Sequence, residues 1–113
     1  MISPYVIPGI KKDKKEYQMQ YILDKVCNFF CIDKEDVLSW NKKAEVAYVR
    51  AWAIYLIKSH TDANNSNLSI LFDRDRSTII SSLHKISKKL NNTDNNNYKR
   101  DFPILISLIN KTT

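Results

Sequence analysis

The amino-acid sequence predicts an all-α fold, a compact bundle of about six helices in one domain. Apolar residues recur at intervals of three and four along most of the chain. Nothing in the sequence is typical of a sheet. The 113 residues are enough to bury one core but too few to add a separate nucleotide-hydrolysing module.

An extended basic arm is expected at residues 1–15, ahead of the folded domain at residues 16–113. The arm contains two of the three prolines, the only glycine and four lysines around Asp13. Such a lysine run can approach phosphates, or it can be a solvated lead-in to the first helix.

The first helix is predicted over residues 16–31, where apolar side chains form a broad face. A short helix should start at Asp33, whose carboxylate can accept free amide hydrogens. A polar loop at residues 40–43 then leads into a scaffold helix over residues 45–60. The residues expected to be buried on that helix are Val46, Val49, Ala53, Leu56 and Ile57.

A brief helix should follow the polar segment 61–67. Its candidate caps are Asn64, Asn65 and Ser66. Residues 73–75 are then expected to make a turn into a helix over residues 76–90, and the asparagine-rich segment 91–97 a loop. A last helix closes the core, with Pro103 acceptable in its first turn. Its apolar residues are Ile104, Leu105, Leu108 and Ile109.

The turn and the helix after it carry the main clue to function. Residues 71–86 read Leu-Phe-Asp-Arg-Asp-Arg-Ser-Thr-Ile-Ile-Ser-Ser-Leu-His-Lys-Ile. An apolar stripe would hold this helix on the domain while the charged, hydroxyl-rich start projects outward. The stripe consists of Ile79, Leu83, Ile86 and Leu90. This pattern is typical of a recognition helix, which reaches base edges and phosphates in the major groove.

The same residues resemble the C-terminal DNA-binding domain of the bacterial replication initiator DnaA, whose signature reads Gly-Arg-Asp-His-Ser/Thr-Thr-Val with Lys-Ile a few residues on. Residues 36–39 are similar to the family's Asp-Leu-Leu-Ser, and residues 46–54 to its Val-Ala-x-x-Arg-x-x-Ala-Met helix. Residues 99–109 are similar to its closing Lys-x-Asp-Phe-x-x-Leu-Ile helix. The resemblance covers residues 18–110 and implies a helix-turn-helix domain that binds double-stranded DNA.

Five residues are candidate base contacts. Asp75 can accept a hydrogen bond from a cytosine amino group, or it can cap the helix. Arg76 stands where the family has histidine and can bind guanine O6 and N7. Ser77 and Thr78 can bond bases or phosphates, although the Thr78 methyl can equally tuck beneath the helix. The resemblance implies that Arg50 enters the minor groove, and the alternative is an ordinary exposed arginine.

Basic residues near this motif are candidate phosphate contacts, because each neutralised phosphate releases counterions. They are Arg74, Lys85, Lys88, Lys89, Lys42 and Lys43. The net charge of +6 favours a polyanionic partner. The alternative for a lysine face is simple solvation.

Two departures from the family pattern concern the same surface. Only Asp73 lies between Phe72 and Arg74, where the family usually has two residues, often both glycine. The turn therefore lacks glycine's access to positive φ, and the recognition helix can shift in orientation. The family's basic loop is also diluted, to Trp-Asn-Lys-Lys-Ala-Glu at residues 40–45.

Several other functions are not expected. One glycine cannot build a nucleotide phosphate loop, and no nucleophile and base suggest an enzyme, so we predict no cofactor, nucleotide or catalytic residue. Cys27 and Cys31 are four residues apart in a predicted helix, a spacing that suits packing better than a disulfide. His60 and His84 lie far from them, so no metal site is predicted. Without a signal peptide or membrane span, a cytoplasmic location is expected.

The alternative function is a protein-interaction module that keeps the helical fold and has lost strong DNA binding. It would use exposed aromatic side chains of Trp40, Tyr48 or Trp52 to bind a replication or regulatory protein. The biological role remains open among replication initiation at an origin, transcription regulation, and competition with a full-length initiator.

Overall fold

The computed structural model describes residues 14–94 and 96–110, and their regular secondary structure is entirely α-helical. The helices are α1 (Lys14–Phe30), α2 (Lys34–Leu38), α3 (Ala44–His60), α4 (Asn65–Phe72), α5 (Arg76–Asn91) and α6 (Asn97–Asn110). The predicted all-α class is therefore confirmed. Residues 1–13 of the expected arm lie outside the described residues, and its last two residues belong to α1.

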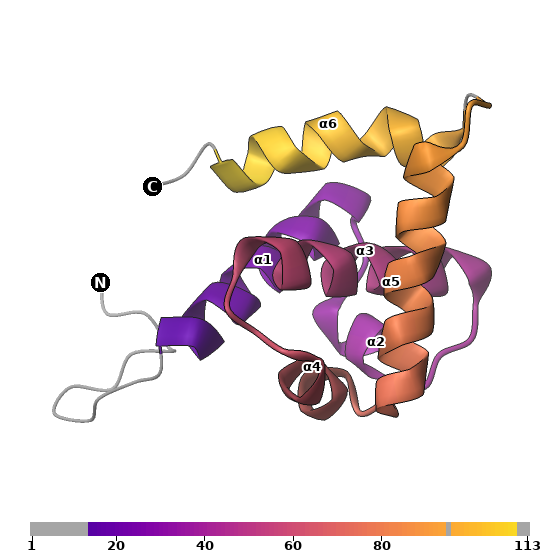
Figure 1. The fold of residues 1–113 in the computed structure, drawn as a ribbon. Helices are drawn as coiled ribbons and strands as arrows, with labels where there is room; N and C mark the ends of the chain where they lie inside the picture. The colour runs from indigo at the N-terminus through magenta and orange to yellow at the C-terminus, as the bar shows by residue number, and fades with distance from the viewer. Residues whose placement is uncertain (1–13, 95, 111–113) are drawn as a thin grey trace, which may run out of the picture.

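Helix α3 is the centre of the fold and contacts α1, α2, α4 and α5. Figure 1 shows the other helices arranged around it, with α6 along the top of the view and α4 at the bottom. Nine of its 17 residues are buried, so the helix has no broad solvent-facing side. Within the described chain, none of the helices combines the length and the apolar character that crossing a bilayer needs.

Trp52 lies at the centre of this core and has no exposed surface. Its ring stacks on Phe102 of α6, with centroids 5.9 Å apart and planes 19° apart. The expectation that Trp52 is exposed for a partner protein is therefore wrong. Other helices cover α3 on several sides, so the spacing of its apolar residues does not mark out one solvent-facing stripe. Exposure of Trp52 could therefore not be judged from that spacing.

The starts of two short helices follow the sequence in different ways. Asn64 caps α4 as expected: its side-chain oxygen accepts from the Asn67 amide at 2.8 Å, and the Asn67 side chain accepts from the Asn64 amide at 2.9 Å. Asp33 occupies the N-cap of α2, but its carboxylate makes no capping hydrogen bond. The carbonyl of Asp33 accepts from the Asp36 and Val37 amides instead.

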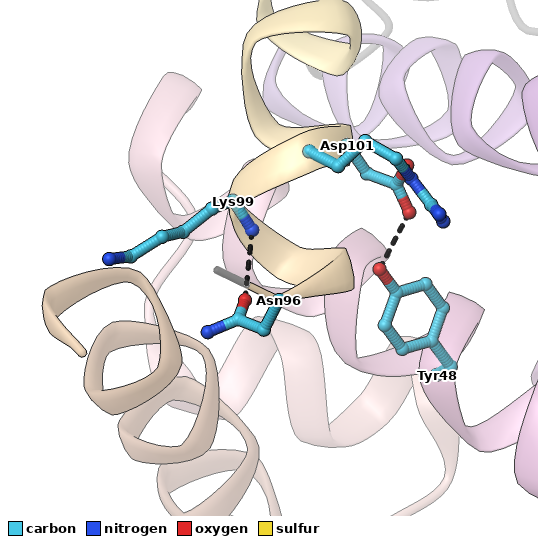
Figure 2. A network of polar contacts seen from close by, with 5 residues as sticks. Tyr48, Asn96, Lys99 and Asp101 are labelled. Carbon is cyan, nitrogen blue, oxygen red and sulfur yellow. Dashed lines mark hydrogen bonds and ion pairs between the residues drawn. The ribbon is translucent and has the colours of Figure 1, made fainter. Parts of the chain in front are cut away.

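Helix α6 begins earlier than the sequence suggested. Asn96 caps it, because its side-chain oxygen accepts from the Lys99 amide at 3.1 Å (Figure 2). Pro103 therefore lies inside the helix and not in its first turn. Since proline has no amide hydrogen, the Lys99 carbonyl loses its helical partner. Pro103 lies on the exposed side of the helix, where water can hydrate the Lys99 carbonyl.

A buried carboxylate attaches α6 to the core. Asp101 is only 4% exposed, and its Oδ2 accepts a hydrogen bond from the Tyr48 hydroxyl at 2.6 Å (Figure 2). Arg100 Nε donates to the other oxygen at 3.1 Å. Burial, and then this bond to Asp101, raise the pKa of Tyr48 above its ordinary value of 10. The apolar residues of α6 divide: Leu105 and Ile109 are buried, whereas Ile104 is exposed.

Replacing Tyr48 with phenylalanine tests this attachment. The variant leaves the Asp101 carboxylate without its phenol donor, so we expect the free energy of unfolding to fall by about 1–3 kcal/mol in urea titrations. Tyr98→Phe is the control. The ring centroids of Tyr98 and Tyr48 are 4.9 Å apart, but the Tyr98 hydroxyl has no hydrogen bond among the described residues. Equal losses in the two variants would show that the hydrogen bond contributes nothing.

The two cysteines should differ in reactivity. Both thiols are free; Cys27 is buried and Cys31 is exposed at a positive φ of 56°. Burial, followed by the nearby charge of Asp24, raises the pKa of Cys27 to about 11. We expect a thiol reagent at pH 8 to modify one cysteine in the folded protein and two in denaturant, with Cys31→Ser removing the fast reaction. Rapid modification of both thiols in the native state would contradict this assignment.

The raised pKa of Cys27 also makes the stability of the protein depend on pH. The folded state favours the neutral thiol of Cys27, so its contribution to stability is fully present below the ordinary pKa of 9.0. That contribution should be lost as the pH rises from there toward 11. Urea titrations of the wild type and Cys27→Ala across this interval measure it as a difference in pH dependence.

Candidate nucleic-acid interface

Helices α4 and α5 form a helix-turn-helix, with the turn at residues 73–75 as predicted. Leu68 and Phe72 of α4 and Ile79 and Ile86 of α5 have no exposed surface. These four side chains hold the pair of helices on the core. The opposite side of α5 is thereby left toward solvent, as a recognition helix requires.

The turn reaches its shape without glycine. Asp73 adopts the left-handed conformation at φ 52° and ψ 52°. Among residues with a Cβ, aspartate and asparagine tolerate this region best. The Arg74 amide then donates to the Ser69 carbonyl at 3.1 Å, and the Ser69 hydroxyl donates to the Arg74 carbonyl. A single aspartate therefore provides the left-handed residue of this turn, where the family usually has two glycines.

The start of α5 presents its polar side chains to solvent. Asp75, Arg76, Ser77 and Thr78 are all exposed. Asp75 occupies the N-cap, yet its carboxylate makes no capping hydrogen bond, and only its backbone carbonyl accepts from the Ile79 amide at 3.1 Å. Of the two interpretations of Asp75, side-chain capping is therefore not what the structure shows. The carboxylate remains available to a ligand.

Sequence reasoning missed part of this outward face. Ile80 is 41% exposed and lies one turn from Arg76, and Ser81 and His84 continue the same face. The sequence predicts that Ile79 is a core residue, and Ile80 follows it directly. Adjacent residues of a helix are about 100° apart, so burial of Ile79 was a usable signal that Ile80 faces away.

The lysines proposed as phosphate contacts are also on the surface. Lys85, Lys88 and Lys89 are exposed on α5, and Lys42 and Lys43 are exposed in the loop between α2 and α3. No ion pair engages any of the five within the described parts of the chain. Lys89 does lie 6.0 Å from the ring centroid of Tyr98. The structure thus leaves most of this positive charge to solvent.

Arg50 is not a surface residue, and both interpretations of it from sequence are wrong. It is 9% exposed, and its Nε donates to the Val37 carbonyl at 2.7 Å. Its Nη2 donates to the carbonyls of Ser39 and Asn41, both at 3.0 Å. Helices leave their last carbonyls unpaired, and Arg50 satisfies those at the end of α2. Burial, and then the charge of Arg74, lower the pKa of Arg50.

Arg74 is likewise engaged within the protein, contrary to its expected role at a phosphate. Its Nη1 donates to the Phe72 carbonyl at 3.0 Å, and its Nη2 donates to the Ser39 carbonyl at 2.7 Å. The guanidinium carbon lies 4.3 Å from the ring centroid of Trp40. Because the turn is tight, the Arg74 side chain folds back over it and satisfies the carbonyl of Phe72, the last residue of α4.

A sequence model of the family described as "Bacterial dnaA protein helix-turn-helix" matches residues 19–86, from within α1 to near the end of α5. The chain belongs to this family. The match includes the turn and the exposed start of α5, but not residues 99–109.

Individual DnaA proteins match most of the chain's length. The chromosomal replication initiator protein DnaA of Chlorobaculum tepidum is 35% identical over 82 residues, which are 72% of this chain and 17% of that protein. The DnaA of Oleidesulfovibrio alaskensis is 30% identical over 86 residues, 76% of this chain and 19% of that protein. The DnaA of Mycoplasma pneumoniae is 26% identical over 84 residues, 74% of this chain and 19% of that protein. The chain thus spans less than a fifth of the length of these relatives.

The buried arginine of this DnaA-type domain can be tested by Arg50→Met, which keeps much of the aliphatic stem. Carbonyls at the end of α2 would lose their donor, so we expect the free energy of unfolding to fall by about 3 kcal/mol in urea titrations. Arg76→Met is the matched control, because Arg76 is exposed and should change stability by less than about 0.5 kcal/mol. Unchanged stability of Arg50→Met would contradict the structural role.

Proposed function

We propose that this chain binds double-stranded DNA in a sequence-specific manner, with α5 in the major groove. One observation carries the proposal: Asp75, Arg76 and Ser77 stand exposed at the N-terminal end of a helix whose opposite side is packed into the core. The second helix of a helix-turn-helix contacts base edges with its N-terminal residues. Membership of the DnaA helix-turn-helix family supports the same role.

Four polar side chains and one apolar side chain are proposed to contact bases. The Asp75 carboxylate would accept from a cytosine amino group, and the Arg76 guanidinium would donate to guanine O6 and N7. The hydroxyls of Ser77 and Thr78 would bond bases or adjacent phosphates. Ile80 adds an apolar group to the same face, which suits contact with a thymine methyl. Because Arg76 replaces a histidine of the family signature, the preferred site should differ from the family's at that position.

The exposed lysines are proposed to bind phosphates. Lys85 and Lys88 of α5 would hold the backbone beside the major groove, and Lys42 and Lys43 would hold a neighbouring strand segment. These contacts carry no sequence information, but they add affinity through counterion release. The buried arginine of α3 has no part in this proposal, since its donors are satisfied inside the protein.

The relatives bear the name chromosomal replication initiator, and on that basis we propose a binding site within a replication origin or its regulatory region. A second candidate function is binding of a replication or regulatory protein through Trp40, which is 63% exposed. Titration against random and A/T-rich duplexes at several salt concentrations separates the two, because a protein-binding module should have little duplex affinity even in dilute salt.

The roles of Arg76 and Lys85 lead to different expected results. On a duplex selected from a randomised pool, Arg76→Ala should cost about 1–3 kcal/mol of binding energy and relax preference at one or two base pairs. Lys85→Ala should weaken binding to selected and random duplexes alike and reduce the salt slope by about 1. Fluorescence anisotropy at several salt concentrations measures both effects.

Lys25→Ala is the control for Lys85→Ala, because Lys25 lies on α1, outside the helix-turn-helix and the loop before α3, with its amine 5.5 Å from the Tyr21 ring centroid. It should leave both affinities and the salt slope close to those of the wild type. Identical losses for Arg76→Ala and Lys85→Ala on selected and random duplexes would refute the division into base-reading and phosphate-binding residues.

A further inference from the structure

Trp40 is exposed, yet its indole is held in place by the protein. Its Nε1–H donates to Asp73 Oδ2 at 3.1 Å, and the Arg74 guanidinium carbon lies 4.3 Å from its ring centroid. Trp40 as a whole is 63% exposed. We call Trp40, Asp73 and Arg74 the indole clasp.

The clasp joins two segments that lie 33 residues apart in the chain. Trp40 belongs to the loop between α2 and α3, which also carries Lys42 and Lys43. Asp73 and Arg74 form the turn that immediately precedes α5. Arg74 strengthens the connection, since its Nη2 also donates to the Ser39 carbonyl of the loop at 2.7 Å.

Apolar packing alone leaves the start of α5 weakly fixed. Ile79 is the first residue of this helix that the core buries, and the three exposed residues Arg76, Ser77 and Thr78 precede it. Apolar contacts are non-directional, whereas hydrogen bonds depend on angle as well as distance. Hydrogen bonds between Ser69 and Arg74 attach the turn to α4, and the indole clasp adds directional contacts from the turn to the basic loop.

We propose that the indole clasp fixes the start of α5 relative to the basic loop, so that base and phosphate contacts engage one duplex together. Trp40 is then a positioning residue for sequence selectivity, although it reads no base. This inference rests on the proposed DNA binding. A role for Trp40 in capturing another protein is disfavoured, because its N–H and one ring face are already occupied within the chain.

Two variants remove the same hydrogen bond from opposite sides. Trp40→Phe keeps an aromatic ring beside Arg74 but has no N–H. Asp73→Gly keeps access to the left-handed backbone but has no carboxylate. Each should lower the ratio of affinities for selected and random duplexes by about tenfold, and the charge-neutral Trp40→Phe should leave random-duplex affinity and the salt slope unchanged. The double variant should lose no more than either single one, because both remove one shared contact.

Two controls keep the rest of the surface intact. Asp73→Asn retains a side-chain oxygen that can accept from the indole and tolerates the left-handed backbone, so it should keep the wild-type affinity ratio. Ile70→Ala removes a side chain that is 80% exposed and lines the same surface hollow as Trp40, outside the clasp. It should also keep the ratio within about twofold, as surface substitutions away from special contacts do.

The outcomes distinguish this inference from the function on which it rests. A wild-type protein that prefers no duplex sequence overturns the proposed function before any variant is compared. A selective wild type whose Trp40→Phe and Asp73→Gly variants remain equally selective overturns the positioning role alone. Additive losses in the double variant also overturn it, because they would show that the two residues act independently.

Discussion

The carbonyl oxygen of Ser39 accepts hydrogen bonds from two guanidinium groups, and the arrangement of the proposed DNA-binding surface depends on this convergence. Arg50 reaches it from α3 at 3.0 Å, and Arg74 reaches it from the turn before α5 at 2.7 Å. Neither arginine forms an ion pair with a carboxylate of the described residues. The unpaired carbonyls at the ends of α2 and α4 provide the negative partial charge that holds both cations.

This use of arginine changes how the net charge should be interpreted. The charge of +6 includes two guanidinium groups whose donors are engaged inside the protein. In the proposed function, attraction of DNA would depend on Arg76 and on the exposed lysines of α5 and of the loop after α2. Charge counted from composition describes the whole molecule, whereas association with a polyanion depends on where each cation lies.

Asp73 combines two roles that are usually separate. Its backbone supplies the left-handed residue that ends α4, and its carboxylate accepts from the indole of Trp40. A glycine would provide the first role and not the second. The proposed recognition helix thus follows a turn that is one residue shorter than the family pattern, and the hydrogen bond between Asp73 and Trp40 connects this turn to the loop after α2.

The sequence alone determined the all-α class, the order of the helices and the exposed start of α5, because these depend on local periodicity and turn chemistry. It did not predict the burial of Arg50, the full burial of Trp52 or the place of Pro103 in the interior of α6. The position of Pro103 follows from the local Asn96 cap, whereas the burial of Arg50 and of Trp52 depends on groups supplied by distant segments: the carbonyls after α2 and the Phe102 ring. Tertiary structure decided them because a polar or aromatic side chain is buried only where the fold brings it a partner.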